Sequence, residues 1–308
     1  MGERYLIVNA DDFGMCESTD RAILRLFREK EITSTTILGP APHSNEAIRE
    51  AAEHKLPAGV HWALNSDFER EPWHSVAPSG KVPSLDCGDG LPHDLGLLAK
   101  RAKSREVTAE LDAQVQKMIR GGCPPDHADN HCGTLYGING RLFFLNAFRL
   151  CRKYRLPFRL PGRPEFLKRE FGEKWPRRVQ ALYYMVIHTA KGMGVDLLDG
   201  LITNPWPVRK IPGYEALRAY YLKWAASTEE GITEMFLHPA CPDSRMEALT
   251  PEWAKREMEY RFLLSGDLRK LAEKEDIRLV SWGQAPFRSR KRSRGSGKQP
   301  GGPQVSKG

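Results

Sequence analysis

Short apolar segments alternate with amphipathic helical patterns along most of the chain. The apolar segments predict strands at 5–8, 33–38, 59–64, 127–131, 158–160, 200–203, 233–238 and 277–281. Apolar side chains spaced three and four apart predict helices at 17–30, 45–54, 108–119, 141–154, 215–226 and 253–271. This repeated alternation favours an α/β fold, an irregular TIM-type (β/α)-barrel, whose active residues would lie at the C-terminal strand ends.

Two segments interrupt the alternation. Residues 65–104 show little periodicity and contain many proline, glycine and aspartate residues, and a loop of this length in a compact domain is usually functional or disordered. Residues 161–200 form a basic, aromatic insertion that should contain at least one helix. The sequence does not assign a role to either segment.

The net charge of +8 is concentrated at the C-terminus. The final segment carries seven basic residues and no acidic residue: Arg288, Arg290, Lys291, Arg292, Arg294, Lys298 and Lys307. Because this segment has almost nothing to bury, we predict one barrel domain over residues 1–285 and a disordered basic tail over 286–308. The rest of the chain is then close to neutral, so nucleic acid would make only non-specific contacts with the tail.

The composition also bears on location. No apolar run is long enough to cross a bilayer, and a strand pattern begins at once, which leaves no room for a signal peptide. The six cysteines are scattered without a C-x-x-C pair, as is typical of reduced thiols. We therefore expect a cytoplasmic protein with no membrane partner, and we allow for a homodimer.

Two adjacent carboxylates, Asp11 and Asp12, follow the first predicted strand. Buried carboxylates are costly unless a cation or a hydrogen-bond network receives them. Neighbouring side chains of a regular strand point to opposite faces, so both can reach one site only where the backbone turns, and Gly14 makes a turn cheap. The alternative is an ordinary strand-to-helix turn in which an aspartate caps the next helix.

A second polar stretch coincides with the fourth predicted strand. A spacing of two places His127, Asp129 and His131 on one face of that strand. Three ligand-capable side chains on one face are rare in a structural strand, where apolar residues would alternate with polar ones. The alternative interpretation is a surface strand.

Two further histidines fall at strand ends. His61 lies at the same end of its strand as the two groups above, and three such ends converge in a parallel barrel. One aspartate and two histidines would leave coordination positions open for water and substrate, as catalytic metal sites do. His238, which Pro239 follows, is a candidate general acid, or equally a capping or packing residue.

Taken in chain order, these motifs resemble the YdjC-type carbohydrate deacetylases. The matching stretches are Asn9-Ala10-Asp11-Asp12-Phe13-Gly14, Gly59-Val60-His61, His127-Ala128-Asp129-Asn130-His131 and Leu237-His238-Pro239, supported by Ile32-Thr33-Ser34 and Arg159-Leu160-Pro161. The resemblance covers roughly residues 5 to 282. It implies a barrel-like fold and a hydrolase that removes the acetyl group from an N-acetylated carbohydrate with the help of a divalent metal ion.

The resemblance also implies roles for individual residues. Asp12, His61 and His131 would hold the metal ion, Asp11 would be the general base, and His238 would lie near the leaving group. Two imidazoles and a carboxylate suit zinc, but also a hydrated magnesium ion, manganese or iron. We expect one divalent metal ion as cofactor, either magnesium or zinc.

Two residues of the fourth strand have supporting roles in this interpretation. His127 and Asp129 would orient the metal ligands through hydrogen bonds. Many family members continue the histidine cluster with Gln-His-x-His, whereas this chain has Cys132-Gly133-Thr134, which indicates a different substrate mouth. The sugar itself stays undetermined.

Two other functions compete with this one. A metal hydrolase of another amide or ester bond would use the same ligands, and a phosphatase would usually add a second metal or basic groups, for which Arg159 and Arg163 are the nearby candidates. A polyanion-binding protein acting through its basic tail predicts loss of the carboxylate–histidine set. That set is intact, which favours the enzyme.

Overall fold

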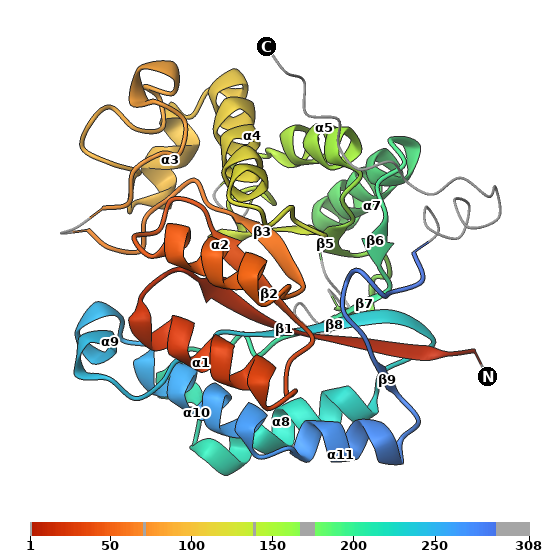
Figure 1. Cartoon of the computed structure of the whole chain (residues 1–308). Helices are drawn as coiled ribbons and strands as arrows, with labels where there is room; N and C mark the ends of the chain where they lie inside the picture. Colours follow the sequence, from red (N-terminus) through yellow and green to blue (C-terminus); the bar gives the residue numbers. More distant parts are fainter. Residues whose placement is uncertain (1, 70–71, 138–139, 167–175, 288–308) are drawn as a thin grey trace.

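The computed structural model describes residues 2–69, 72–137, 140–166 and 176–287. Its strands pair in parallel and form one nine-stranded sheet in the order β6-β5-β4-β3-β2-β1-β8-β7, with β9 also beside β1 (Figure 1). They are β1 (Arg4–Phe13), β2 (Ser34–Leu38), β3 (Ala58–Trp62), β4 (Ala128–Asn130), β5 (Phe158–Pro161), β6 (Leu197–Leu198), β7 (Gly200–Ile202), β8 (Gly231–Leu237) and β9 (Arg278–Leu279).

The two ends of the sheet meet at Asp199. β6 pairs with β5 and β7 pairs with β8, and only Asp199 separates β6 from β7. The Asp199 N–H donates to the Ile232 carbonyl at 2.8 Å, so the chain passes directly from one edge of the sheet to the other. The result is a nearly closed parallel barrel, which confirms the predicted (β/α)-barrel. Each predicted strand is present, and β6 is an addition.

Helices lie on the outside of the strands, with α1, α8, α10 and α11 grouped below β1 in Figure 1. They are α1 (Glu17–Arg28), α2 (Ser44–Glu53), α3 (Leu95–Arg101), α4 (Ser104–Arg120), α5 (Phe144–Tyr154), α7 (Arg177–Gly192), α8 (Tyr214–Ala226), α9 (Ser244–Leu249), α10 (Trp253–Leu264) and α11 (Asp267–Lys274), with 3-10 turns at Ser79–Lys81, His131–Gly133 and Val208–Lys210. The aperiodic segment 65–104 thus contains α3, and the insertion 161–200 contains α7. No helix in the described ranges is long and apolar enough to cross a membrane.

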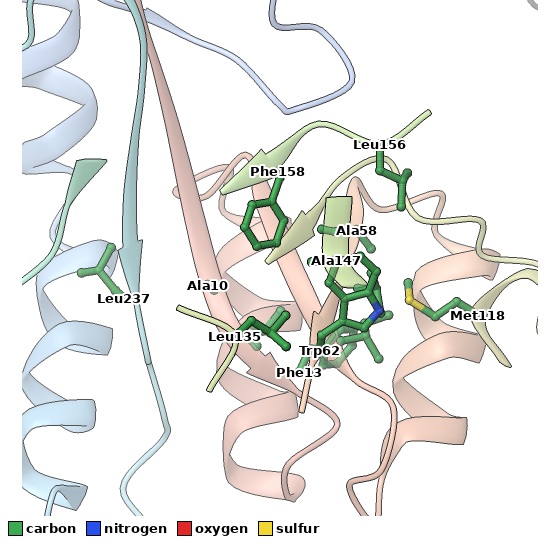
Figure 2. Close-up of a cluster of buried hydrophobic side chains, with 14 of the residues drawn as sticks. Ala10, Phe13, Ala58, Trp62, Met118, Leu135, Ala147, Leu156, Phe158 and Leu237 are labelled. Atoms are coloured by element: carbon green, nitrogen blue, oxygen red, sulfur yellow. The ribbon is translucent and has the colours of Figure 1, made fainter. Parts of the chain in front are cut away.

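Alternation along the strands separates an outer core from the barrel interior. In β1, Leu6, Val8 and Ala10 pack into the large apolar cluster beneath the helices, whereas Ile7 belongs to a separate small cluster. Figure 2 shows part of the outer core, in which Trp62 and other large side chains fill the space between strands and helices. This packing keeps the strand ends fixed relative to one another.

The barrel interior changes character along its length. Near the N-terminal strand ends it is filled by the small apolar cluster, which comprises Ile7, Leu198, Leu201, Ile232, Trp282, Ala285 and Phe287. Toward the C-terminal ends it carries buried polar side chains, namely Asn9, Asp11, His61, Asp129 and Arg159. Glu234 lies between the two halves, in register with Ile7 and Leu201. Among the described residues, the carboxylates and imidazoles that could share one metal ion therefore lie in the second half.

One predicted boundary needs correction. Phe287, which we assigned to the disordered tail, is 3% exposed and stacks on Trp282 with ring centroids 5.5 Å apart. An aromatic ring of this size gains more from burial than its short connection costs in entropy. The folded part therefore extends to Phe287, and the predicted disorder of the basic residues beyond it lies outside the described residues.

Candidate active site

The two aspartates reach one region because β1 carries a bulge. Ala10 aligns with Thr35 and Phe13 with Ile37, so β1 uses one more residue than β2 over this stretch. Asp12 has a left-handed backbone with φ of 70°. Both carboxylates are consequently buried. The sequence placed the strand at 5–8, whereas β1 runs to Phe13. The turn that follows contains Gly14, whose φ is 92°, as the sequence predicted.

Asp12, His61 and His131 form a triangle of ligand atoms. Asp12 Oδ1 lies 3.4 Å from His61 Nε2 and 3.5 Å from His131 Nδ1, and the two nitrogens are 3.2 Å apart. The three side chains come from the end of β1, from β3 and from the 3-10 turn after β4. They are the residues that the sequence predicted as metal ligands.

This triangle fits a divalent cation. Zinc–ligand distances are about 2.0–2.2 Å, and three atoms with these separations can all reach one ion at that distance. Both Asp12 oxygens are buried, and while Oδ2 is paired with Arg256, Oδ1 accepts no conventional hydrogen bond among the described residues. Burial would lower the pKa of His61, but the Asp129 carboxylate raises it to about 9, so the site favours positive charge.

Each histidine of the triangle is oriented by a second carboxylate. Asp129 lies directly across from His61 in the β3–β4 pairing, and its Oδ1 is 2.6 Å from His61 Nδ1. Asp67 Oδ1 is 2.8 Å from His131 Nε2. A carboxylate on one ring nitrogen fixes the tautomer and leaves the other nitrogen free to bind a metal ion. Asp67 comes from the aperiodic segment 65–104, where no pattern in the sequence marked it.

Asp11 is held by Arg159 of β5. Arg159 Nη1 and Nη2 lie 2.6 and 2.8 Å from the two Asp11 oxygens, while its Nε donates to Glu234 at 2.8 Å. Burial would raise the pKa of Asp11, but the Arg159 guanidinium lowers it to about 2. Asp11 therefore stays ionised at neutral pH. From the sequence, Arg159 was noted only as part of a stretch that matches the family and as a candidate for phosphate binding.

His238 lies on the solvent side of Asp11. Its Nε2 is 3.8 Å from Asp11 Oδ2, and its side chain is 33% exposed. Its backbone N–H donates to Glu259 Oε2 at 2.7 Å, which fixes the chain at the end of β8. Burial lowers the pKa of the imidazole despite the nearby Asp12 and Asp11. The ring is thus accessible from solvent and close to Asp11.

Sequence reasoning missed two charged residues of α10 that serve the site. Arg256 Nη2 lies 2.7 Å from Asp12 Oδ2, and Glu259 accepts the His238 N–H described above. Burial would raise the pKa of Asp12, but Arg256 holds it well below its usual value. Arg256 and Glu259 are three residues apart and so lie on one helix face. That spacing was visible, but a charged pair on a helix usually indicates a solvent-exposed face.

The structure does not bring His127 to this group. Its Nδ1 is 2.6 Å from Asp126 Oδ1, and its ring stacks on Trp282 at 4.4 Å. Space for the ring exists because residue 59 is glycine, where a Cβ atom would lie 2.4 Å from the imidazole. His127 directly precedes β4 and lies at the N-terminal end of the barrel, where it contacts Trp282 of the small apolar cluster.

Comparison with known proteins agrees with this fold. The model of the family described as YdjC-like protein matches residues 5–274. A carbohydrate deacetylase from Enterococcus faecalis is 26% identical over 284 residues, which cover 92% of this chain and 98% of the relative. A chitooligosaccharide deacetylase from Yersinia pestis is 34% identical over 137 residues, 42% of this chain and 49% of the relative.

A solved structure extends the similarity to three dimensions. It belongs to a protein from Enterococcus faecalis V583 described as a candidate cellobiose-phosphate cleavage protein. The two chains are 25% identical with a TM-score of 0.70, and the match covers 91% of this chain and 98% of the other. As its motifs predicted, the chain belongs to the YdjC-like family.

Proposed function

We propose that this protein is a metal-dependent hydrolase that removes the acetyl group from an N-acetylated sugar or oligosaccharide. Its relatives from Enterococcus faecalis and Yersinia pestis are named as deacetylases of carbohydrates and chitooligosaccharides. Membership of the family makes the chain a hydrolase acting on an amide C–N bond, as the sequence predicted. The observation that carries the proposal is the triangle of Asp12, His61 and His131 with Asp11 beside it.

The triangle would hold the cofactor. When bound there, a divalent metal ion supplies Lewis-acid chemistry, because it polarises an amide oxygen and lowers the pKa of water from 15.7 toward about 7. Two imidazole nitrogens and one carboxylate oxygen suit zinc, and magnesium with additional waters is the second candidate. Asp129 and Asp67 keep the two imidazoles in the orientation that binding requires.

Asp11 would accept the proton of the attacking water. Its pKa of about 2 keeps it ionised, and Arg159 and Asn9 fix its position. When Asp11 becomes neutral, Arg159 remains paired with Glu234 and with Asp129, whose Oδ2 is 2.6 Å away. The proton transfer therefore does not leave a buried guanidinium without a counter-charge, a situation that would be strongly destabilising.

His238 would protonate the departing amine. Its ring is the histidine of the site with the greatest side-chain exposure, and it is 3.8 Å from Asp11 Oδ2. Burial lowers its pKa, which makes the protonated imidazole a better proton donor. Asp11 would thus take a proton from the attacking water, and His238 would supply one to the departing amine. A cytoplasmic location and a homodimer stay predictions from the sequence.

The direct test is acetate release. Purified protein would be stripped with a chelator, reloaded with magnesium or zinc, and incubated with N-acetylglucosamine and N-acetylated chitooligosaccharides. We expect acetate release that depends on the added metal and is lost in His61→Ala, with His127→Gln as a control on the same barrel interior. Equal release by stripped and reloaded protein would contradict the metal dependence, and no release from any of these sugars would contradict the substrate class.

A further inference from the structure

Arg256 has a donor that the folded chain leaves unused. Arg256 is 9% exposed, and its Nη2 lies 2.7 Å from Asp12 Oδ2. The other terminal nitrogen, Nη1, is buried and has no hydrogen-bond partner within the described part of the chain. Buried guanidinium groups normally have all their donors paired, so an unpaired Nη1 needs an explanation.

Arg159, the other buried arginine of the site, shows what a fully used guanidinium looks like. Its Nε, Nη1 and Nη2 all lie within 3.0 Å of carboxylate oxygens from Asp11, Asp129 and Glu234. Arg159 therefore serves the fold and the position of Asp11. Arg256 uses one end of its fork for Asp12 and keeps the other end free.

Arg256 lies next to the proposed metal position. Asp12 presents Oδ1 to His61 and His131 and Oδ2 to Arg256, so Arg256 borders the proposed metal position across a single carboxylate. The same helix fixes His238 through Glu259. The Ala240 N–H also donates to the Arg256 carbonyl at 3.3 Å, which ties the helix to the loop after β8. Arg256 is therefore held in place between the proposed metal ligands and the proposed acid.

We propose that Nη1 of Arg256 binds an oxygen of the acetyl group, namely the acyl oxygen of the substrate and a carboxylate oxygen of the acetate product. A planar guanidinium with one nitrogen already on a carboxylate matches such an oxygen in geometry and charge. The contact strengthens as negative charge develops on the acyl oxygen during attack by water. This inference rests on the proposed function, since it takes the ligand to be an acetyl group.

The probe is acetate itself. Carbon-13 acetate would be titrated into metal-loaded protein and followed by NMR, with sodium chloride added to constant ionic strength. Arg256→Lys keeps a positive charge near Asp12 but loses the second nitrogen of the fork. We expect its acetate affinity to fall by roughly tenfold or more, because a charge-assisted hydrogen bond is lost. Arg261→Lys is the matched control: it lies on the same helix, with its guanidinium 3.9 Å from the Tyr214 ring, and should bind acetate like the wild type.

Two further measurements separate binding of acetate from binding of metal. Calorimetric metal titration of each variant ensures that acetate is compared at full metal occupancy, and the acetate titration is repeated on metal-free protein. Arg256→Gln is a neutral variant that keeps one N–H donor group. If the hydrogen bond dominates, its acetate affinity should lie between those of the wild type and Arg256→Lys. Circular dichroism checks that all variants are folded.

The outcomes are distinct. Weaker acetate binding in Arg256→Lys at full metal occupancy, with Arg261→Lys unchanged, supports the inference. Acetate affinity equal to wild type in Arg256→Lys and Arg256→Gln would overturn it, as would a change in metal affinity alone, which would make Arg256 only a positioning residue for Asp12. Failure of the wild type to release acetate from sugars would instead contradict the proposed function, and the titration would still decide whether Arg256 binds a carboxylate.

Discussion

His127 and His131 flank the same short strand, β4, yet belong to two different regions of the barrel. His131 lies at the C-terminal end, where Asp12, Asp67 and His61 surround it with polar atoms. His127 lies at the N-terminal end, where its ring stacks on Trp282. Both are buried, so burial alone does not distinguish them. The residues that surround each histidine distinguish them.

The contrast reflects a division of the barrel interior. The C-terminal half brings carboxylates and imidazoles together around a position that favours a cation. The N-terminal half carries a stack of three rings, from His127 through Trp282 to Phe287. In barrel enzymes the C-terminal end of the strands carries the catalytic residues, and the N-terminal end contributes to stability. Substitutions at the two ends should therefore separate metal binding from folding.

The largest effect is expected from removal of a ligand. His61→Ala and His131→Ala should each lower metal affinity by more than ~100-fold, since loss of an outer partner alone typically costs about 10–100-fold. The free energy of unfolding of the metal-free protein should change far less. Calorimetric metal titration and urea unfolding measure the two quantities. Retention of full metal occupancy in either variant would remove that residue from the ligand set.

The opposite behaviour is expected at the N-terminal end. Phe287→Ala should lower the free energy of unfolding by roughly 3 kcal/mol, because it empties a buried aromatic site against Trp282. Metal affinity should stay within about twofold of wild type. Urea unfolding of the metal-free protein is the measurement. Unchanged stability would place the end of the folded part before Phe287, as the sequence first predicted.

An intermediate effect should come from the carboxylates that orient the histidines. Asp129→Asn should lower metal affinity by about 10–100-fold, because His61 loses its charged acceptor. Asp67→Asn, which removes the charged partner of His131, should lower metal affinity to a smaller extent, since the Asp67 side chain is 24% exposed and water can replace it. Equal metal affinity in Asp129→Asn and wild type would show that His61 needs no such partner.

The smallest effect is expected for His127→Gln. Glutamine can still meet Asp126 but loses the stack on Trp282, so stability should fall by about 1 kcal/mol. Metal affinity should be unchanged within about twofold. A large loss of metal in this variant would mean that the two ends of the barrel are coupled, and it would restore the ligand-orienting role that the sequence predicted for His127.

The sequence predicted what depends on local pattern. Strand and helix positions follow from periodicities that each segment carries within itself, and the barrel follows from their alternation. The convergence of parallel strand ends brought the aspartate pair and the histidines together, and the resemblance to the family then singled out Asp12, His61 and His131. Periodicity predicted a strand face for His127, but it does not specify how deep in the barrel a residue lies. That depth depends on the register of the neighbouring strands.

The residues that the sequence missed depend on packing between distant segments. Asp67 reaches His131 from a segment with no period, and Arg256 reaches Asp12 from a helix near the other end of the chain. Each is an ordinary charged residue in its local context. The bulge that turns Asp12 inward is also a matter of pairing, since it appears only when β1 is aligned with β2.

The central claim is that the two neighbouring aspartates have different roles, Asp12 as metal ligand and Asp11 as proton acceptor. Metal titration beside steady-state acetate release, on Asp11→Asn and Asp12→Asn, tests it most directly. We expect Asp12→Asn to lose both metal affinity and activity. Asp11→Asn should keep the metal and lose about 10²–10⁴-fold in kcat. If Asp11→Asn turns over near the wild-type rate, or if it alone loses the metal, the assignment is wrong.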